Sequence, residues 1–288
     1  MRALTRTLTA ATGVALALTL AACGTASTGD TPAGADPTDV ATTAAAEPTS
    51  PEADADGAPP AYSSADLVAV LSAQEPARSI RMTTTTSVNG MTMTAESSTV
   101  NDGGTISVES AVEQNGTTIR TVFVDGVFYM SLGEMTQDKF VTIDPADTTN
   151  PLAGYVPDID ALQKQGQIPL TDEMLIESED LGVEEVEGVA ARHYRLVLDT
   201  TSYMSLIQDI SGPELAEVYE QMPDTVEIDY WLDADDLPVQ SVTEAMGATT
   251  TVVFHGWNDP AITVAAPAAG DVISWAEFEA LAEAAAGA

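Results

Sequence analysis

Residues 80–132 read IRMTTTTSVNGMTMTAESSTVNDGGTISVESAVEQNGTTIRTVFVDGVFYMSL, and this stretch decides the fold. Five short segments alternate in sequence between two kinds of side chain, which is the period of a β-strand. The segments are separated by four turns in which glycine follows Asn or Asp: Asn89-Gly90, Asp102-Gly103, Asn115-Gly116 and Asp125-Gly126. Such turns are typical of tight hairpins. The stretch therefore predicts a five-stranded antiparallel meander.

The rest of the chain adds strands to this meander and interrupts them twice. Further strand patterns occur at 139–143, 174–186, 191–199, 226–233, 239–246 and 249–257. Helical or irregular patterns occupy 151–165 and 201–222, and a closing helix is expected over 274–286. The predicted fold class is α+β, with a single antiparallel half-barrel sheet of about 10–11 strands wrapped over a few helices.

One helix is predicted before the meander. Residues 64–71 read SADLVAVL, in which Ser64 is the expected N-terminal cap and Leu67, Val70 and Leu71 form an apolar face. Pro76 ends the helical pattern, because proline cannot continue a helix.

The first 23 residues, MRALTRTLTAATGVALALTLAAC, have the pattern of a secretion signal. Arg2 and Arg6 precede an uncharged stretch, 8–22, that is shorter than the roughly 20 residues of a membrane-spanning helix. The following Leu20-Ala21-Ala22-Cys23-Gly24 resembles the bacterial lipobox. That resemblance implies cleavage after residue 22, a diacylglycerol thioether on Cys23 and usually a further acyl chain such as palmitate. The alternative is a chance cysteine after an ordinary signal.

Residues 23–61 are expected to be a lipidated cysteine followed by a disordered acidic tether rich in Ala, Thr and Pro. Val40 is the one bulky apolar residue after Cys23, and Lys and Arg are absent from this stretch of the sequence. Such a composition buries too little apolar surface to offset chain entropy. A coil of this length spans roughly 35 Å. The expected organisation is a signal peptide at 1–22, the tether, and a folded lipid-binding domain at 62–288.

The charge of the chain excludes several classes of function. There are 9 Lys and Arg against 45 Asp and Glu in 288 residues, which gives a formal net charge of −36. This balance is incompatible with a phosphate-neutralising surface, so we expect no nucleic-acid partner. A single cysteine provides neither an internal disulfide nor a Cys-rich metal site.

Catalytic chemistry is not expected either. The two histidines, His193 and His255, lie within strand patterns, and the sequence has no G-x-S-x-G nucleophile motif. Asp233-Ala234-Asp235-Asp236 suggests a calcium loop but lacks the glycine and distal Glu of an EF-hand, so a polar β-turn is preferred. We therefore expect no enzyme activity, no cofactor and no metal site.

The predicted inner face of the sheet is short of side-chain volume. Small residues such as Thr84, Ala95, Ser97, Ser110 and Thr121 alternate in step with larger ones. Close packing requires this space to be filled, either by the apolar helices of 201–222 or by a ligand. If a ligand fills it, the expected lining consists of Ile80, Met82, Met93, Ile106, Val108, Ile119, Phe123, Tyr129, Tyr203, Leu206, Ile207, Ile210 and Met222.

Three motifs favour the ligand. Residues 188–196 read GVAARHYRL, 230–239 contain YWLD followed by LPV, and 256–267 contain GWNDP followed by AP. In this order they resemble the LppX/LprG-type actinobacterial lipoproteins, relatives of the LolA and LolB lipoprotein carriers, over about 67–272. The resemblance implies a half-barrel with a hydrophobic cavity for acyl chains, used to carry lipids or glycolipids across the envelope. It implies no catalytic residue.

Together, these observations predict a lipoprotein on the extracytoplasmic face of the cell membrane, anchored through Cys23, that binds lipid or glycolipid acyl chains for carriage or envelope assembly. We expect a monomer, with an envelope transporter among its partners. The alternative is an envelope interaction lipoprotein with a filled core that binds a protein partner. The identity of the lipid and the direction of transport do not follow from the sequence.

Overall fold

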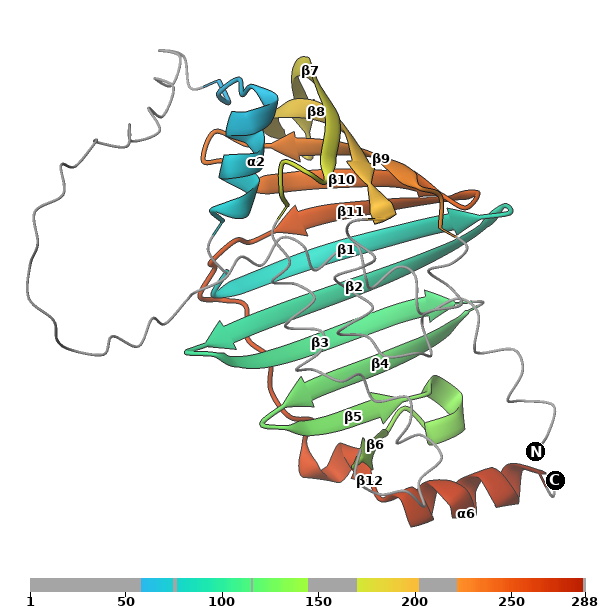
Figure 1. Ribbon diagram of the computed structural model, residues 1–288. Helices are drawn as coiled ribbons and strands as arrows, with labels where there is room; N and C mark the ends of the chain where they lie inside the picture. Colours follow the sequence, from blue (N-terminus) through green and yellow to red (C-terminus); the bar gives the residue numbers. More distant parts are fainter. Residues whose placement is uncertain (1–57, 75–76, 115, 145–169, 202–221, 287–288) are drawn as a thin grey trace, which may run out of the picture.

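The computed structural model describes residues 58–74, 77–114, 116–144, 170–201 and 222–286. These residues form one twelve-stranded sheet with two α-helices, α2 (Ser64–Ser72) and α6 (Trp275–Ala286) (Figure 1). The strands are β1 (Ser79–Val88), β2 (Met91–Asp102), β3 (Thr105–Gln114), β4 (Thr117–Val124), β5 (Val127–Ser131), β6 (Phe140–Ile143), β7 (Leu175–Val186), β8 (Val189–Asp199), β9 (Thr225–Leu232), β10 (Pro238–Ala245), β11 (Ala248–His255) and β12 (Val272–Ile273). The predicted fold class is confirmed.

The sheet consists of two meanders joined in the middle. Its order is β12-β6-β5-β4-β3-β2-β1-β11-β10-β9-β8-β7, so β1 pairs with β11 although they are far apart in sequence. Every pair is antiparallel except β12 and β6, which are parallel. All eleven segments expected from the alternating pattern are strands. The twelfth, β12, has two residues and is too short to produce a period of two in the sequence.

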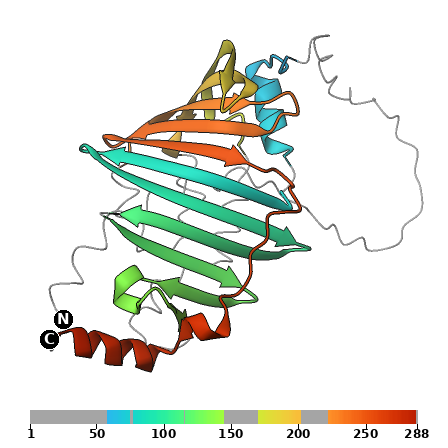
Figure 2. The ribbon, with the colours of Figure 1, turned by 180° about the vertical axis from the view of Figure 1, so that it is seen from behind.

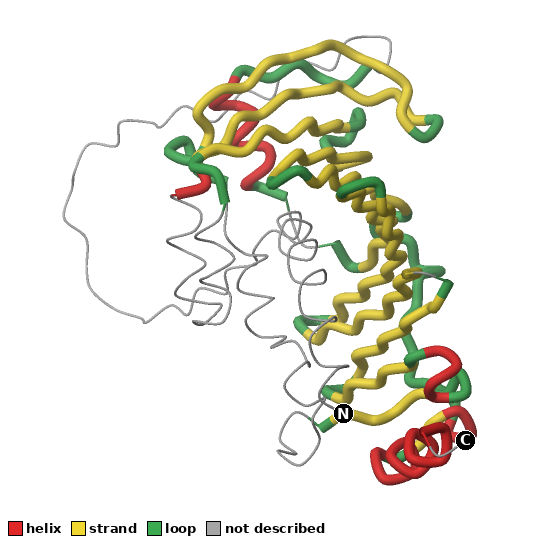
Figure 3. Tube along the Cα trace, turned by 90° about the vertical axis from the view of Figure 1, so that its right-hand side faces the viewer, coloured by secondary structure: helices red, strands yellow, loops and turns green. Residues whose placement is uncertain are grey.

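The sheet curves, and α2 lies on its inner side (Figure 3). Leu67 of α2 is fully buried against Tyr194, Leu196 and Leu232 of β8 and β9. A second buried cluster combines Ile80 with Val252 and Phe254, at the junction of β1 and β11. The cluster around Ile80 joins the two meanders, and the cluster around Leu67 packs α2 on β8 and β9.

The stretch from 256 to 271 connects β11 in the middle of the sheet with β12 at its edge, and runs past the ends of the intervening strands (Figure 2). It is attached at its start, where the Trp257 indole N–H donates to the Pro238 carbonyl at 2.8 Å. Gly256 has φ +63°, and a Cβ there would lie 2.8 Å from Ile262. The positive φ therefore favours glycine here, and any other residue would also have to displace the terminal methyl of Ile262.

Side-chain caps fix where the two helices begin. The cap of α2 is Ser63, whose hydroxyl accepts from the Asp66 N–H, and not Ser64 as predicted. The expected residue is displaced by one because two serines precede Asp66 and the pattern does not distinguish them. At α6, Ser274 and Glu277 form a reciprocal capping box, in which the Ser274 N–H donates to the Glu277 carboxylate at 2.8 Å.

Some expectations concern residues outside the described ranges. They include the lipobox with Cys23, the tether as far as residue 57, the interruption at 151–165 and most of the one at 201–222.

Replacing the buried leucine of α2 tests the packing of the helix on the sheet. Leu67→Ala removes a side chain with 0% exposure, so we expect the free energy of unfolding to fall by about 2–5 kcal/mol. Leu181→Ala, at a position that is 41% exposed, is the matched control and should cost far less. Urea unfolding of both variants provides the measurement, and equal losses would contradict this packing.

Candidate functional site

The strand register brings most of the predicted lining residues to the inner face of the sheet. Met82 of β1 is paired with Ser97 of β2 and Phe254 of β11, and Val108 of β3 with Phe123 of β4. Paired residues lie on the same face, and alternate residues of a strand share a face. The predicted residues on this face are therefore Ile80, Met82, Met93, Ile106, Val108, Ile119 and Phe123.

Tyr129 lies on the opposite face from these residues. The two-residue turn at Asp125-Gly126 pairs Val124 with Val127, so that Phe128 comes opposite Phe123 and Tyr129 opposite Val122. Phe128 therefore occupies the inner position next to Phe123, where it is buried. Of the remaining predicted residues, Met222 is half-buried just before β9, and Tyr203, Leu206, Ile207 and Ile210 lie outside the described ranges.

The inner face carries no charged side chain over nine of the twelve strands, β1–β6 and β9–β11, as the structure describes them. All the charged residues of these strands alternate onto the outer face: Arg81, Glu96, Asp102, Glu109, Glu113, Arg120, Glu227, Asp229 and Glu244. In β7 and β8, three charged residues point inward: Asp180, Glu185 and Arg192. Asp180 and Arg192 form an ion pair at 2.9 Å.

The middle of the inner face is lined by small and hydroxyl side chains that hydrogen-bond to one another. The Ser110 and Thr121 hydroxyls lie 2.8 Å apart across β3 and β4, and those of Thr86 and Thr250 lie 3.3 Å apart across β1 and β11. Hydroxyls paired in this way satisfy part of each other's hydrogen-bonding capacity and leave an uncharged surface. On β2 and β3, Met93, Ala95, Ser97, Ile106, Val108, Ser110 and Val112 are all half-buried. The surface therefore suits contact with an apolar chain.

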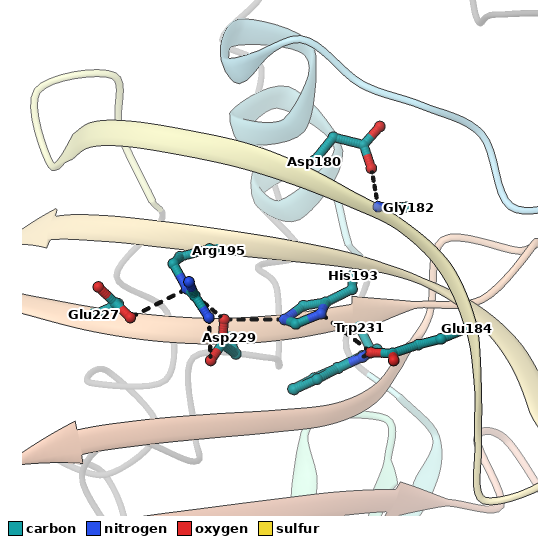
Figure 4. Close-up of polar contacts among 8 residues, drawn as sticks. All are labelled: Asp180, Gly182, Glu184, His193, Arg195, Glu227, Asp229 and Trp231. Carbon is teal, nitrogen blue, oxygen red and sulfur yellow. Dashed lines mark hydrogen bonds and ion pairs between the residues drawn. The ribbon is translucent and has the colours of Figure 1, made fainter.

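A polar network that the sequence analysis did not anticipate lies on the outer face of β7–β9 (Figure 4). The His193 imidazole lies between two carboxylates, with Nδ1 3.1 Å from Glu184 and Nε2 3.0 Å from Asp229. Its ring stacks on Trp231 with centroids 4.1 Å apart, and Arg195 donates to Asp229 at 3.0 Å. The signal in the sequence was the alternation of acids at 227 and 229 on one strand with a histidine at 193 and an arginine at 195 on its neighbour.

The side chains of this network connect β7, β8 and β9 on the outer face of the sheet. The Trp231 indole N–H donates to the Glu184 carboxylate, which connects β9 with β7 across β8. The side chains of His193 and Asp229 are 15% and 23% exposed, and each polar contact described here is to another member of the network. We therefore assign it a structural role.

A second polar cluster attaches the N-terminal segment to the sheet. The Tyr194 hydroxyl donates to the Pro60 carbonyl at 3.1 Å and accepts from the Tyr62 N–H at 3.0 Å. The Arg192 guanidinium donates to the Pro59 carbonyl, and the Tyr62 hydroxyl to Asp236. Contacts with the domain thus begin at Pro59, which is fully buried.

Burial raises the pKa of both tyrosines in this cluster. Burial raises the pKa of Tyr194 to about 12, and burial together with the hydrogen bond to Asp236 raises the pKa of Tyr62 still further. Both hydroxyls therefore stay protonated well above the pH at which an exposed tyrosine ionises.

The turn at 233–236 is a polar β-turn, as predicted. The Asp233 carboxylate accepts from the N–H groups of Asp235 and Leu237 at 2.8 and 2.9 Å, and burial raises its pKa. Among the described residues, no group of three or more possible ligands is arranged to hold a metal ion. Within the same ranges, neither helix has the length and apolar character needed to cross a bilayer.

Neither a protein-family model nor a curated protein sequence matches this chain, but solved structures do. The chain is similar to LprF from Mycobacterium bovis, with 14% identity and a TM-score of 0.47, over 67% of this chain and 90% of that one. It is also similar to the lipoprotein LppX of Mycobacterium tuberculosis, with 12% identity and a TM-score of 0.41, over 70% and 100%. A third similar structure is MucB in complex with MucA, with 17% identity and a TM-score of 0.34, over 66% and 54%. LppX, from which the family suggested by the sequence motifs takes its name, is thus among the similar structures.

The two raised tyrosine pKa values predict a loss of stability at alkaline pH. Below about pH 10, tyrosine is protonated in both the folded and the unfolded chain. Between about pH 10 and 12 the unfolded chain releases these protons first, so the stability they contribute is lost as the pH rises through this window. Tyr194→Phe should lower stability at pH 8 and make the alkaline loss shallower. Urea unfolding from pH 8 to 11 tests this, with Tyr129→Phe as the control outside the cluster.

Proposed function

We propose that the protein is a lipid-anchored envelope lipoprotein that binds the acyl chains of a lipid or glycolipid against the inner face of its sheet, for carriage or envelope assembly. One observation supports this proposal above the others. In a chain with a formal net charge of −36, nine strands carry no charged side chain on that face.

The chemistry of the inner face fits an acyl chain better than a polar ligand. Two pairs of its hydroxyls are joined across strands, Ser110 with Thr121 and Thr86 with Thr250, and on this face the described strands β1–β6 and β9–β11 supply no charged group to bind a polar ligand. The methionines Met82 and Met93 add flexible apolar contacts that adapt to varied chain shapes. Apolar ligand sites in proteins are lined in the same way, with a small number of polar groups for orientation.

The second candidate is a lipoprotein with a filled inner face that binds a protein partner. It is favoured by the buried clusters under α2 and at the junction of β1 and β11, which show that part of this face is already packed. The two candidates differ in the middle of the sheet. Lipid fills it in the first, and the protein's own side chains fill it in the second.

Tryptophan variants on the two faces of β2 distinguish these candidates. Ala95→Trp places a large ring on the inner face between Thr84 and Val112, and Thr94→Trp places the same ring on the outer face as a matched control. If lipid occupies the inner face, Ala95→Trp should displace it with little change in melting temperature. In a filled core, the same change should cost about 1–3 kcal/mol or more.

The measurement combines native mass spectrometry with thermal unfolding. We expect co-purified lipid with the wild-type protein and Thr94→Trp, and reduced lipid with Ala95→Trp. A wild-type protein without lipid, together with a large loss of stability in Ala95→Trp, would show an ordinary core and overturn the proposal.

The anchor has its own test. Cys23→Ala removes the thiol that receives the diacylglycerol, so we expect an unprocessed or poorly retained precursor in membrane fractions. Membrane fractionation and the mass of the mature N-terminus measure this. A Cys23→Ala protein that is cleaved and retained normally would contradict lipidation at this residue.

A further inference from the structure

The hairpin turns in the middle of the sheet differ in charge between its two ends. At the end where β1 begins, the turns are acidic, with Asp102, Asp125, Glu187, Asp233, Asp235 and Asp236. At the end where β1 finishes, the three adjacent hairpin turns at 89–90, 115–116 and 246–247 contain no charged residue in the sequence. The connections on either side of these three hairpins do carry charge, at Glu134, Asp138, Lys139, Asp172, Glu173 and Asp224. In a chain with five times as many acids as cations, one end of the sheet thus presents uncharged hairpin tips.

Two of these uncharged tips carry exposed methionines side by side. Met91 is 65% exposed at the start of β2, and Met246 is 47% exposed in the β10–β11 turn. Val88 of β1 pairs with Met91 on one side and Ala248 on the other, so the two tips are neighbours at the right of Figure 1. Met135, 55% exposed, lies between β5 and β6 at the same end.

Met246 also has an unfavourable backbone conformation for its side chain. The first residue of each two-residue hairpin turn has a positive φ: 51° at Asn89, 53° at Asp125, 52° at Glu187 and 54° at Met246. Asn and Asp tolerate this left-handed region because they hydrogen-bond locally, and an unbranched apolar side chain lacks that compensation. Folding therefore gains nothing from a methionine here, which points to a role for its exposed side chain.

We propose that the tips 88–91 and 245–248, here called the methionine rim, contact the apolar surface of a lipid bilayer while an acyl chain passes between that bilayer and the inner face. This inference rests on the proposed function. By register, Val88 and Met91 lie on the inner face, in line with Met93, so the rim continues the surface assigned to the acyl chain.

The charge distribution favours a bilayer as the occupant of the rim. Anionic lipid repels the acidic turns at the far end and the charged connections on either side of the rim, so the uncharged hairpin tips are the part of the sheet that approaches an uncharged bilayer most easily. The nearby acid Glu244 points to the outer face, away from the path of the chain. Two small tips are also far below the area of a stable dimer interface, about 800 Å² per partner, which disfavours a second copy.

Two methionines bind a bilayer only weakly. A weak contact is sufficient for transfer of an acyl chain if the lipid anchor already keeps the domain close to the membrane. If the domain is anchored through Cys23, as proposed, it experiences an effective concentration of membrane surface in the range of about a millimolar. The rim then needs only a transient contact, whose strength depends on apolar area and not on charge. We therefore expect contact with uncharged phosphatidylcholine bilayers, weakened by anionic lipid at low salt.

Site-specific quenching tests the rim. Met91→Cys and Met246→Cys are labelled with bimane in the protein purified from membranes and reconstituted on phosphatidylcholine vesicles that contain doxyl-labelled lipid. The matched control is Asp125→Cys, in a turn of the same conformation at the opposite end. Wild-type protein, whose one cysteine is Cys23, gives the background. We expect severalfold stronger quenching at both rim positions than at Asp125→Cys.

Several results would overturn the proposal. Quenching equal to that of Asp125→Cys would show that the rim does not contact lipid and leave a protein partner as its occupant. Protein-concentration-dependent association of the wild type in sedimentation, lost in Met91→Ser, would identify a contact between copies. The single variant Met246→Asn, in the turn between β10 and β11, should keep the melting temperature and the bound lipid, yet move fluorescent lipid between vesicles severalfold more slowly.

These readouts separate the rim from the proposed function. Bound lipid in native mass spectrometry reports on the inner face, whereas quenching and transfer rate report on the rim. If the protein holds lipid but the labels at the rim are not quenched, the proposed contact between the rim and the bilayer is wrong and the proposed function stands. If no lipid is found with the protein, both the proposed function and the proposed role of the rim are wrong.

Discussion

The pairing of β1 with β11 is the constraint on which the rest of the structure depends. Eight consecutive pairs, from Arg81 with His255 to Val88 with Ala248, join the two meanders into one sheet. Because successive side chains of a strand alternate between faces, this register places Met82 and Phe254 on the same side. A slip of one residue would turn every side chain of one meander over relative to the other and bring its acids to the inner face.

That constraint explains how a chain of such high negative charge keeps an uncharged surface. The acids of the strands are spread over the outer face, where water screens their repulsion. Strand β8 carries two arginines that form ion pairs: Arg195 pairs with Glu227 and Asp229 on the outer face, and Arg192 pairs with Asp180 on the inner face. His193 joins the same set between Glu184 and Asp229. The outer face of β7–β9 is thereby fastened by charge, and the inner face of the central strands is left to apolar contacts.

Much of this architecture could be predicted from the sequence, because tight turns fix register. Asn89-Gly90 and Asp125-Gly126 each define a two-residue hairpin, so the strands on either side follow by counting. The same counting would have placed Phe128 and not Tyr129 on the inner face, since Asp125 and Gly126 are the whole turn. The grouping of Met82, Val108 and Phe123 on one face was correctly inferred from the alternation.

Other features were beyond the sequence because they depend on contacts between distant segments. Nothing local shows that Pro59 and Pro60 bind to β8, since their carbonyls are recognised by Arg192 and Tyr194 more than 130 positions away. The network around His193 likewise requires three strands in register before Glu184 and Asp229 flank the imidazole. Strand β12 forms because it pairs with β6 in parallel, and its two residues show no strand pattern in the sequence.

The half-buried state of the inner face connects the fold with the proposed function. An apolar surface left in contact with water costs roughly 25 cal/mol for each Å², so a sheet with half-exposed Met93, Val108 and Phe123 gains free energy when an apolar chain covers it. The paired hydroxyls reduce the opposing cost, because one of the O–H groups of Ser110 and Thr121 donates to the other hydroxyl and keeps that hydrogen bond when the pair is covered. A face built from unpaired hydroxyls would lose that advantage, and one built from larger apolar residues would close on itself. The alternation of small paired residues with larger apolar ones therefore leaves the sheet stable enough to fold and still able to gain from a ligand.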